Sequence, residues 1–418
     1  MPRVLLLQGP RSRFPGYLAR ALAARGAEVH RICFCPGDWL FGSGGARTTD
    51  YREPPDRWAE WIAARASAWD ITDLVCLGDG RFWHRVAIDR LRPMGIRVHV
   101  IEQGYLRPHF LTIERDGTGG NSRFPADWER LEDLAAGCHE TKLPDFRTSF
   151  TEFALMDVLY EAANLIFGWR THPHYRTHTL DGALTEWAGW IAKAALWPIR
   201  RRARADAMAR IAHHRGPLFL LPLQLETDYQ IRLHGPYGGM AEALSKTLAS
   251  FAAHAAEDAA IVIKPHPLDN GLAGWQRRVM RKARRLGIEG RVIFVDGGNL
   301  DLLIPGLTGV VTVNSTVGLT ALREGRPVKV LGRAIYDLPG LTHPGSLASF
   351  WNAPAVPEPE RVAVFVRALM AANQVPGGFD GSGARSGSEG VAERIITHNS
   401  PQSHAPSNRQ GDNPREAA

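Results

Sequence analysis

The residues best suited to chemistry in this 418-residue chain directly follow short apolar runs that are typical of β-strands. Lys264 and His266 come directly after the apolar run 260–263, within the sequence Lys-Pro-His-Pro. Proline fixes its own φ angle, so two prolines stiffen this loop and hold a cation and an imidazole in fixed directions. This pair suits a phosphate group, although a rigid turn with an incidental histidine has the same sequence.

A second polar segment consists of Asn314, Ser315 and Thr316, which follow the apolar run 309–313 and precede an expected helix. Backbone N–H groups at a helix start, reinforced by hydroxyl groups, form an anion site. An ordinary helix cap would need only one of these three residues. Together the two segments predict a nucleotide-phosphate site that is formed without a Walker-type lysine loop.

Carboxylates follow a third run, 218–221, in the sequence PLQLETDYQ. Asp228 is the leading candidate for a nucleophile or a base, and Glu226 is its rival. Gln224 and Gln230 of the same segment, and His234 shortly after it, are expected to contact substrate. The alternative is a solvated loop with acids present by chance.

The fourth segment predicts an acceptor site with a general base. Glu102, Gln103 and Arg107 follow the run 98–101, and Glu114 lies downstream. Other polar residues leave neighbouring strands and are expected to line the same opening: Gln8, Asp79, Arg81 and His84. Each could be structural by itself, and their shared position is the argument for function.

Alternating strand and helix patterns position these segments and predict an α/β fold. Strands are expected at 4–7, 28–34, 74–77, 98–101, 218–221, 260–264, 292–295, 309–313 and 328–331, and helices at 14–25, 56–69, 240–256 and 317–324. Ligands bind beyond the carboxyl ends of such strands, which is where the polar segments lie. Two Rossmann-like halves facing a cleft are GT-B-like, although two-domain binding proteins share the pattern. The first half lacks GxGxxG, so no dinucleotide cofactor is indicated.

The expected organisation has four parts. They are a Rossmann-like acceptor domain (1–145), a helical, basic and Trp-rich bridging segment (146–215), a Rossmann-like nucleotide-sugar domain (216–373) and a disordered tail (374–418) with at most a short helix around 390–396. The tail is expected because Gly, Ser, Asn, Pro and charged residues dominate it.

The net charge of +7 is compatible with nucleic acid, an anionic membrane or a phosphorylated substrate. No nucleic-acid-binding motif accompanies it, so nucleic acid is not an expected partner. Much of the positive charge lies in the stretches 200–215 and 277–285, which are interpreted first as two solvated helix faces. The alternative is attraction to an anionic bilayer, because the first stretch directly follows the tryptophan-rich segment 186–197. No run of 18 to 20 apolar residues is present, which predicts a cytoplasmic protein.

Metal sites are not expected from the sequence. The four cysteines lack CxxC spacing and are interpreted as buried thiols: Cys33, Cys35, Cys76 and Cys138. His172, His174 and His178 have no carboxylate or cysteine at ligand spacing, so zinc is not predicted.

Six segments in order resemble the capsule polysaccharide biosynthesis and export proteins of the KpsS/LipB type. The segments are LLLQGP with FPGYLARAL, GDGRFWH, EQGYLRPHFLTIE, LPLQLETDYQIRLHGPY, IKPHP and VNSTVGLTAL, between about residues 4 and 330. The resemblance implies a retaining β-Kdo transferase of GT-B fold. Such an enzyme would use CMP-Kdo to start the capsule linker on a phosphatidylglycerol-type lipid at the inner membrane, with other capsule assembly proteins as partners.

The resemblance also implies roles for individual residues. His266 and residues 314–316 would hold CMP, with Lys264 beside its phosphate. Asp228 would be the nucleophile, and Glu102 or Glu114 the base. No cofactor is required, because cations and helix N–H groups can stabilise the departing phosphate.

One departure weakens the acceptor assignment. Where family members usually have Gly-Val-Asn, this chain has Asp-Gly-Thr-Gly-Gly-Asn at 116–121. Two alternatives remain open: a non-catalytic export or scaffold protein, and a GT-B transferase with another donor such as a UDP-sugar.

Overall fold

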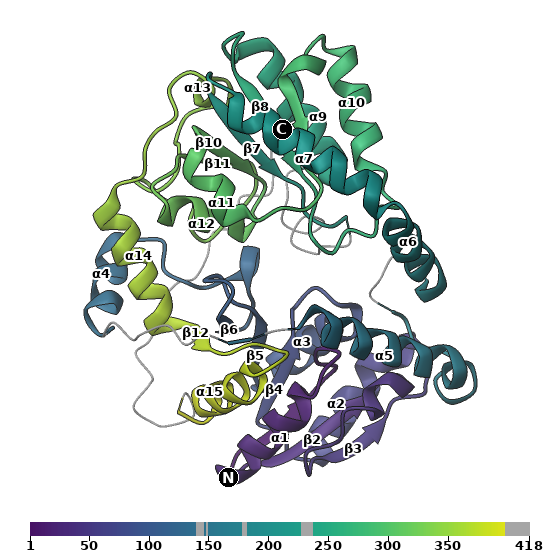
Figure 1. Ribbon diagram of the computed structural model, residues 1–418. Helices are drawn as coiled ribbons and strands as arrows, with labels where there is room; N and C mark the ends of the chain where they lie inside the picture. Colours follow the sequence, from purple (N-terminus) through teal and green to yellow (C-terminus); the bar gives the residue numbers. More distant parts are fainter. Residues whose placement is uncertain (139–145, 148, 178–181, 227–236, 398–418) are drawn as a thin grey trace.

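Two sheets, each wrapped by helices, form two lobes of the molecule (Figure 1). The computed structural model describes residues 1–138, 146–147, 149–177, 182–226 and 237–397. Both lobes have the alternating α/β architecture that the sequence predicts, so the predicted fold class is confirmed.

The first lobe contains a seven-stranded sheet in the order β12-β6-β5-β4-β1-β2-β3. Its strands are β1 (Arg3–Leu6), β2 (Glu28–Cys33), β3 (Arg47–Asp50), β4 (Asp73–Leu77), β5 (Arg97–Gln103), β6 (Phe110–Arg115) and β12 (Gln374–Pro376). The strands β1 to β5 pair in parallel, whereas β6 pairs antiparallel with both of its neighbours, β5 and β12. The central strands are apolar throughout because helices cover both of their faces.

The second lobe contains a five-stranded parallel sheet in the order β11-β10-β7-β8-β9. Its strands are β7 (Leu218–Pro222), β8 (Ala260–Lys264), β9 (Val292–Phe294), β10 (Gly309–Thr312) and β11 (Val328–Val330). The order reverses between β7 and β10, as it reverses between β1 and β4 in the first lobe. Such switch points open crevices at the carboxyl ends of the strands, so each lobe offers one.

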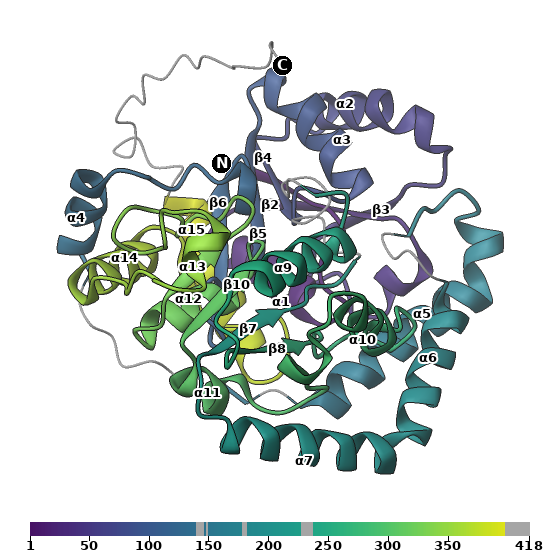
Figure 2. The ribbon, with the colours of Figure 1, turned by 90° about the horizontal axis from the view of Figure 1, so that it is seen from above.

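Helices cover these sheets and connect the lobes. The first lobe carries α1 (Phe14–Ala24), α2 (Trp58–Ala68) and α3 (Phe82–Leu91), and the second carries α9 (Met240–His254), α10 (Trp275–Arg285), α11 (Leu300–Leu303), α12 (Thr316–Arg323) and α13 (Leu347–Phe350). Between the lobes the chain forms α5 (Phe150–Thr171), α6 (Ala183–Ala195) and α7 (Trp197–His213). α5 lies on the first lobe and α7 along the second, with α6 at the edge between them (Figures 1 and 2).

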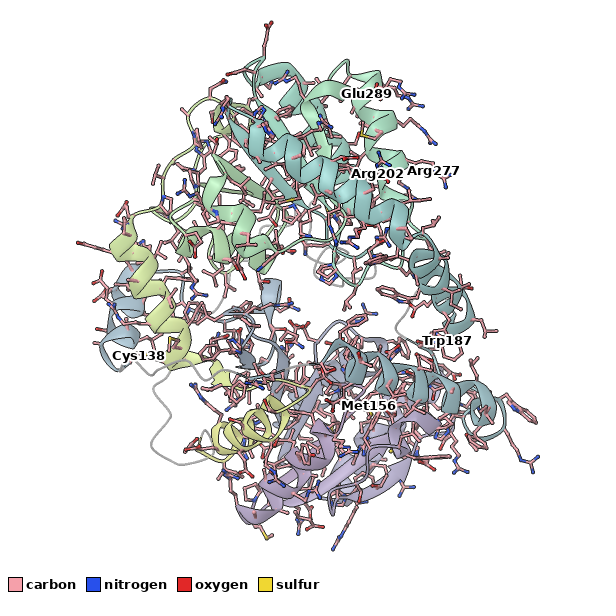
Figure 3. All side chains as sticks on the ribbon, viewed as in Figure 1. Cys138, Met156, Trp187, Arg202, Arg277 and Glu289 are labelled. Atoms are coloured by element: carbon pink, nitrogen blue, oxygen red, sulfur yellow. The ribbon has the colours of Figure 1, made fainter. Side chains whose placement is uncertain are left out.

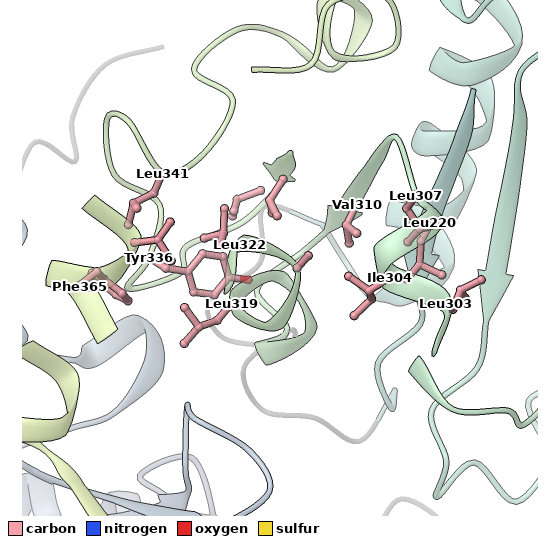
Figure 4. Packing of buried hydrophobic residues seen from close by; sticks show 14 of the residues in the cluster. Leu220, Leu303, Ile304, Leu307, Val310, Leu319, Leu322, Tyr336, Leu341 and Phe365 are labelled. Carbon is pink, nitrogen blue, oxygen red and sulfur yellow. The ribbon is translucent and has the colours of Figure 1, made fainter. Parts of the chain in front are cut away.

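The predicted boundary at residue 145 does not separate the two cores. α4 (Trp128–Ala136) packs against α14 (Pro359–Ala372), and the rings of Phe124 and Phe365 meet edge to face at 5.6 Å. Figure 4 shows the adjoining core, where Tyr336 lies between α12 and Phe365. The chain therefore crosses between the lobes again after the bridging helices, by way of α14.

The prediction of a disordered tail from residue 374 is wrong for residues 374–397. β12 pairs with β6 in the first sheet, and α15 (Gly383–Thr397) packs against α1. The small residues that suggested disorder allow close packing: a Cβ added at Gly387 would lie 2.7 Å from Leu111, and one at Gly390 would lie 2.4 Å from Val375. Residues 398–418 lie outside the described part of the chain.

Asp73, at the start of β4, is fully buried and joins a polar cluster at the end of the first sheet opposite the switch point. Its carboxylate accepts two hydrogen bonds from Arg97, at 2.9 and 2.8 Å, and one from His99 at 2.8 Å. Burial would raise the pKa of Asp73, but the hydrogen bonds from His99, Arg97 and Thr72 outweigh it and hold the pKa below its usual range.

Replacing Asp73 by alanine should therefore destabilise the protein by about 3 kcal/mol, because it leaves the buried His99 ring and the partly buried Arg97 side chain without their acceptor. Urea unfolding measures the loss, and D89A, which removes an exposed acid on α3, is the matched control. A depressed carboxyl pKa contributes stability above the unfolded value near ~4. The difference between wild type and D73A should thus shrink below that pH. Equal free energies of unfolding for wild type and D73A at pH 7 would contradict this prediction.

Candidate active site

A cleft of about 1100 Å³ lies between the lobes, and both switch points open into it. From the second lobe it is lined by residues that follow β7, β8 and β10; from the first lobe, by residues that follow β1, β4 and β5. This arrangement brings together most of the residues that the sequence singled out. They are Asp79, Arg81, Glu102, Gln103, Arg107, Gln224, Lys264, His266, Asn314, Ser315 and Thr316.

Lys264 is the last residue of β8 and a buried cation in this cleft. Its Nζ donates to the carbonyl oxygen of Gly297, and no carboxylate of the described residues lies within ion-pair distance. Burial, and then the charges of Arg204 and Lys193, lower the pKa of Lys264 to about 8. A buried lysine without a carboxylate partner is suited to an anionic ligand.

His266 follows Lys264 by two residues, as the Lys-Pro-His-Pro sequence dictates. Its Nδ1 accepts a hydrogen bond of 3.1 Å from the backbone N–H of Leu268. Burial, followed by the charge of Arg107, lowers the pKa of His266 to about 4, so the imidazole is neutral at pH 7. With Nδ1 occupied as an acceptor, Nε2 carries the proton and is available as a donor.

The segment after β10 begins α12 and forms a cap with several donors. The Ser315 hydroxyl accepts from Val317 N at 3.2 Å, and Gln224 and Asn314 hydrogen-bond to each other, with Gln224 Nε2 donating to Asn314 Oδ1 at 2.9 Å. Gly318 is required here because an added Cβ would lie 2.4 Å from the Tyr336 hydroxyl. The packed tyrosine thus fixes the start of α12, and the positive end of the helix dipole there favours an anion.

The opposite wall comes from the first lobe and carries acids, amides and cations. Glu102 is half-buried at the end of β5 and lines the cleft beside Gln103. Asp79 accepts from Asn121 Nδ2 at 2.8 Å and from Thr118 N at 3.3 Å. Asp79 therefore positions the loop at 116–121, the place where this chain departs from the family pattern.

Arg81 is a cation of this wall, and its guanidinium group makes no hydrogen bond or ion pair to another described residue. Burial lowers its pKa, and Arg11 is among the charges that act on it. Arg11 is compensated by Asp157 and Glu161 of α5, at 2.6 and 2.5 Å. Arg81 is thus a ready partner for an anionic group on the first-lobe side.

Three predicted site residues do not line the cleft. Glu114 is buried behind Tyr105, whose hydroxyl donates to it at 2.9 Å, and burial raises its pKa to about 7. Gln8 is buried beneath α5, where its Nε2 donates to the Tyr160 hydroxyl at 2.8 Å. His84 is buried on α3, and its Nδ1 lies 3.0 Å from the carbonyl oxygen of Leu77.

Asp228, Gln230 and His234 lie outside the described residues, so their predicted roles stay predictions. The cleft also contains residues that the sequence reasoning missed, including Arg11, Arg333 and Asp380. Arg11 and Arg333 could have been found, since they follow β1 and β11 by a few residues. Asp380 could not, because it was assigned to the tail.

Among the residues that the structure describes, no group of three or more His, Cys, Asp or Glu side chains is arranged to hold a metal ion. None of the helices in the described ranges combines the length and hydrophobicity that crossing a membrane would take.

Fold and site together define an α/β protein of the GT-B-like class, with a polar cleft between two Rossmann-like lobes. Residues 72–379 match the family described as capsule polysaccharide biosynthesis protein. The capsule polysaccharide modification protein LipB of Neisseria meningitidis serogroup A is 33% identical over 385 residues, which cover 90% of this chain and 91% of LipB. The chain belongs to this capsule polysaccharide biosynthesis family.

The chain is also similar to a second curated protein and to a solved structure. The capsule polysaccharide export protein KpsS of Escherichia coli is 29% identical over 383 residues, covering 89% of this chain and 95% of KpsS. Among solved structures, the β-Kdo 2,7 transferase KpsC of Thermosulfurimonas dismutans covers 95% of this chain and 100% of its own, with 14% identity and a TM-score of 0.44.

Proposed function

We propose that the protein is a retaining glycosyltransferase that transfers Kdo from CMP-Kdo to a phosphatidylglycerol-type lipid and so starts the capsule linker. The observation that carries the proposal is the cleft, which sets cationic and N–H donors on one wall against a half-buried carboxylate on the other. Membership of the capsule biosynthesis family supports the pathway, and the resemblance described above supplies the donor and the acceptor.

In this proposal the second lobe holds the nucleotide. Lys264 lies beside the phosphate, the Nε2–H of His266 donates to it, and the N–H groups at the start of α12 face it. CMP is already a good leaving group, so these donors need mainly to stabilise the charge that develops as it departs. No metal or other cofactor has a step in this scheme.

The first lobe holds the acceptor. Glu102 is the proposed base for the acceptor hydroxyl, because it lines the cleft whereas Glu114 is buried behind Tyr105. Arg81 is the proposed partner for the acceptor phosphate. Asp228 is the proposed nucleophile, which attacks the anomeric carbon and forms a glycosyl-enzyme ester while CMP leaves. The acceptor oxygen then displaces Asp228, and the base takes its proton, so two inversions give retention.

The test is transfer by purified protein from CMP-Kdo, generated in place, to a fluorescent phosphatidylglycerol-like acceptor. Chromatography and mass spectrometry should show a product heavier by one Kdo. If a product formed only from a UDP-sugar, the donor would be that sugar nucleotide and not CMP-Kdo. No product with any donor, with CMP still bound in calorimetry, would favour the scaffold alternative.

The D228N variant should lower transfer by about 10³-fold or more while CMP affinity is unchanged, because an amide cannot act as the nucleophile. Calorimetry with CMP measures binding beside the transfer assay. E226Q is the matched comparison, since Glu226 is the rival carboxylate. If E226Q loses transfer and D228N keeps it, the nucleophile is Glu226.

A further inference from the structure

The helix α5 has its apolar face turned toward solvent. Six large apolar residues recur at spacings of three, four, six or seven along it and are exposed: Leu155, Val158, Leu159, Leu165, Ile166 and Trp169. At 100° per residue they form one stripe along the helix. Ile166 is 60% exposed and Trp169 is 71% exposed, so the stripe lacks cover from the described residues.

The part of α5 that packs on the first lobe does so through polar side chains. The Tyr160 hydroxyl donates to Asp38 at 2.9 Å, and the Asn164 side-chain oxygen accepts from Gly37 N at 2.8 Å. Asp157 and Glu161 hold Arg11. A helix of a water-soluble lobe ordinarily has the reverse arrangement, so the outward stripe indicates an apolar environment on that side.

The helix α6 and its junction with α7 continue this exposed apolar surface. Leu184 and Ile191, seven residues apart on one face of α6, are 65% and 69% exposed. Leu196, Trp197 and Ile199 follow and are exposed as well. The ring centres of Phe150 in α5 and Trp190 in α6 lie 6.4 Å apart. Both views show the two helices at the same edge of the molecule (Figures 1 and 2).

Basic side chains border this surface, which we name the α5–α6 surface. Arg170 follows Trp169 at the end of α5, and Arg201 and Arg202 follow Trp197 at the start of α7; all three are exposed. Arg201 lies 5.3 Å from the centre of the Trp197 ring. Figure 3 labels Met156 on α5, Trp187 on α6 and Arg202 on α7. Apolar residues bordered by tryptophan and arginine match the chemistry of a bilayer interface.

The two helices that carry the α5–α6 surface also line the cleft, through Phe153 and Asp157 on another face of α5 and Glu186 of α6. We propose that the α5–α6 surface docks into the headgroup region of an anionic phospholipid bilayer and presents the cleft to lipid headgroups. The proposal deepens the proposed function and rests on it for the lipid acceptor.

A second copy of the chain fits this surface less well. In a two-fold dimer the basic borders of the two copies would face each other across the contact and repel. An anionic bilayer attracts the same charges, at about five-fold in affinity per basic residue near the surface.

The test measures sedimentation of the full-length protein with vesicles of phosphatidylcholine, with and without phosphatidylglycerol. Wild type should bind the anionic vesicles, and salt should weaken the binding. The triple variant Ile166→Ser, Trp169→Ser and Ile191→Ser should lower the partition coefficient by at least about ten-fold. The pair Arg201→Glu and Arg202→Glu should weaken binding to anionic vesicles alone.

The matched control replaces three exposed apolar residues away from this surface: Met94→Ser, Leu302→Ser and Val356→Ser. It should bind vesicles within about two-fold of wild type, because a few side chains distant from the bilayer contribute little. Unchanged binding by the α5–α6 triple variant would overturn the proposal. So would a wild-type dimer that this variant dissociates, since the surface would then serve self-association.

Transfer to a water-soluble glycerophosphate acceptor separates this proposal from the proposed function. The α5–α6 triple variant should keep that transfer while losing vesicle binding. If wild type binds vesicles but transfers nothing, the docking surface is supported and the proposed function is contradicted. If both proteins transfer Kdo and bind vesicles equally, the proposed function is supported and the docking surface is contradicted.

Discussion

Replacing Lys264 by methionine should lower kcat/KM for transfer from the CMP-sugar by about 10²- to 10³-fold, the usual effect of removing one donor from a developing anion. Methionine has nearly the same length and keeps the packing, so the change removes mainly the charge. Lys264 is buried and lines the cleft, and among the described residues its Nζ donates to a neutral carbonyl oxygen, that of Gly297. A phosphate would therefore meet a cation that is largely desolvated already.

The pH dependence gives the same prediction a second readout. The pKa of Lys264 is lowered to about 8, so the cation is present below that pH and is lost above it. The donor KM of wild type should therefore rise as the pH passes through about 8. His266, with its pKa lowered to about 4, stays neutral across this range. K264M should lack this rise.

The control for this experiment is K246M, which removes an exposed lysine of the same lobe that pairs with Glu242 on α9. Surface pairs contribute little, so transfer should be within about two-fold of wild type. If K264M kept both its kcat/KM and the rise in KM above pH 8, the donor phosphate would have to lie elsewhere in the cleft.

The sequence predicted the second-lobe wall of this cleft well, for a reason of geometry. In a parallel sheet all carboxyl ends lie at one edge, so the residues that follow each strand meet there whatever their separation along the chain. That rule brought Lys264 and His266 together with Asn314. It also covers Arg333 after β11, which was overlooked because no motif surrounds it.

The same rule failed for residues whose side chains point away from the cleft. Gln8 follows β1, yet it is turned under α5 and donates to Tyr160. His84 lies within the first turn of α3 and faces the carbonyl oxygen of Leu77. Strand order fixes where a backbone segment ends, but tertiary packing fixes where its side chain goes. Periodicity likewise predicted α5 as a helix without showing that its apolar stripe faces outward.

Composition misled most at the C-terminus, because Gly and Ser serve both disorder and close packing. In α15 the glycines lie against Leu111 and Val375, a contact that no larger residue would allow. Such packing depends on a partner strand more than 200 residues away in the chain, β6. No local pattern encodes that partner, and the segment was therefore assigned to a tail.

Truncation after Asn373 should consequently unfold the first lobe or leave it aggregated. It removes β12, the edge strand on β6, and with α15 it removes Val391 and Ile395, both fully buried. Each buried apolar side chain stabilises the fold by about 1.5 to 3 kcal/mol, whereas the free energy of unfolding of a whole domain is only about 5 to 15 kcal/mol. Urea unfolding followed by circular dichroism measures the effect.

A milder variant guards against a protein too insoluble to measure. I395A should cost about 2 to 5 kcal/mol by leaving a cavity beside α1, whereas E393A, an exposed change on the same helix, should cost about 0.5 kcal/mol or less. A chain ending at Thr397 keeps all the described contacts and should unfold at the urea concentration of the full-length protein. If truncation after Asn373 had no more effect than that, the C-terminal segment would not belong to the first lobe.

The C-terminal segment both stabilises the first lobe and contributes a residue to the cleft. Between β12 and α15 it carries Phe379, whose ring meets Phe14 edge to face at 5.0 Å and whose carbonyl oxygen accepts from the Ser12 hydroxyl at 2.7 Å. Asp380 follows and lines the cleft, and burial raises its pKa to about 6. Any shorter chain that still folds should therefore also bind its acceptor less well, because one wall of the cleft is gone.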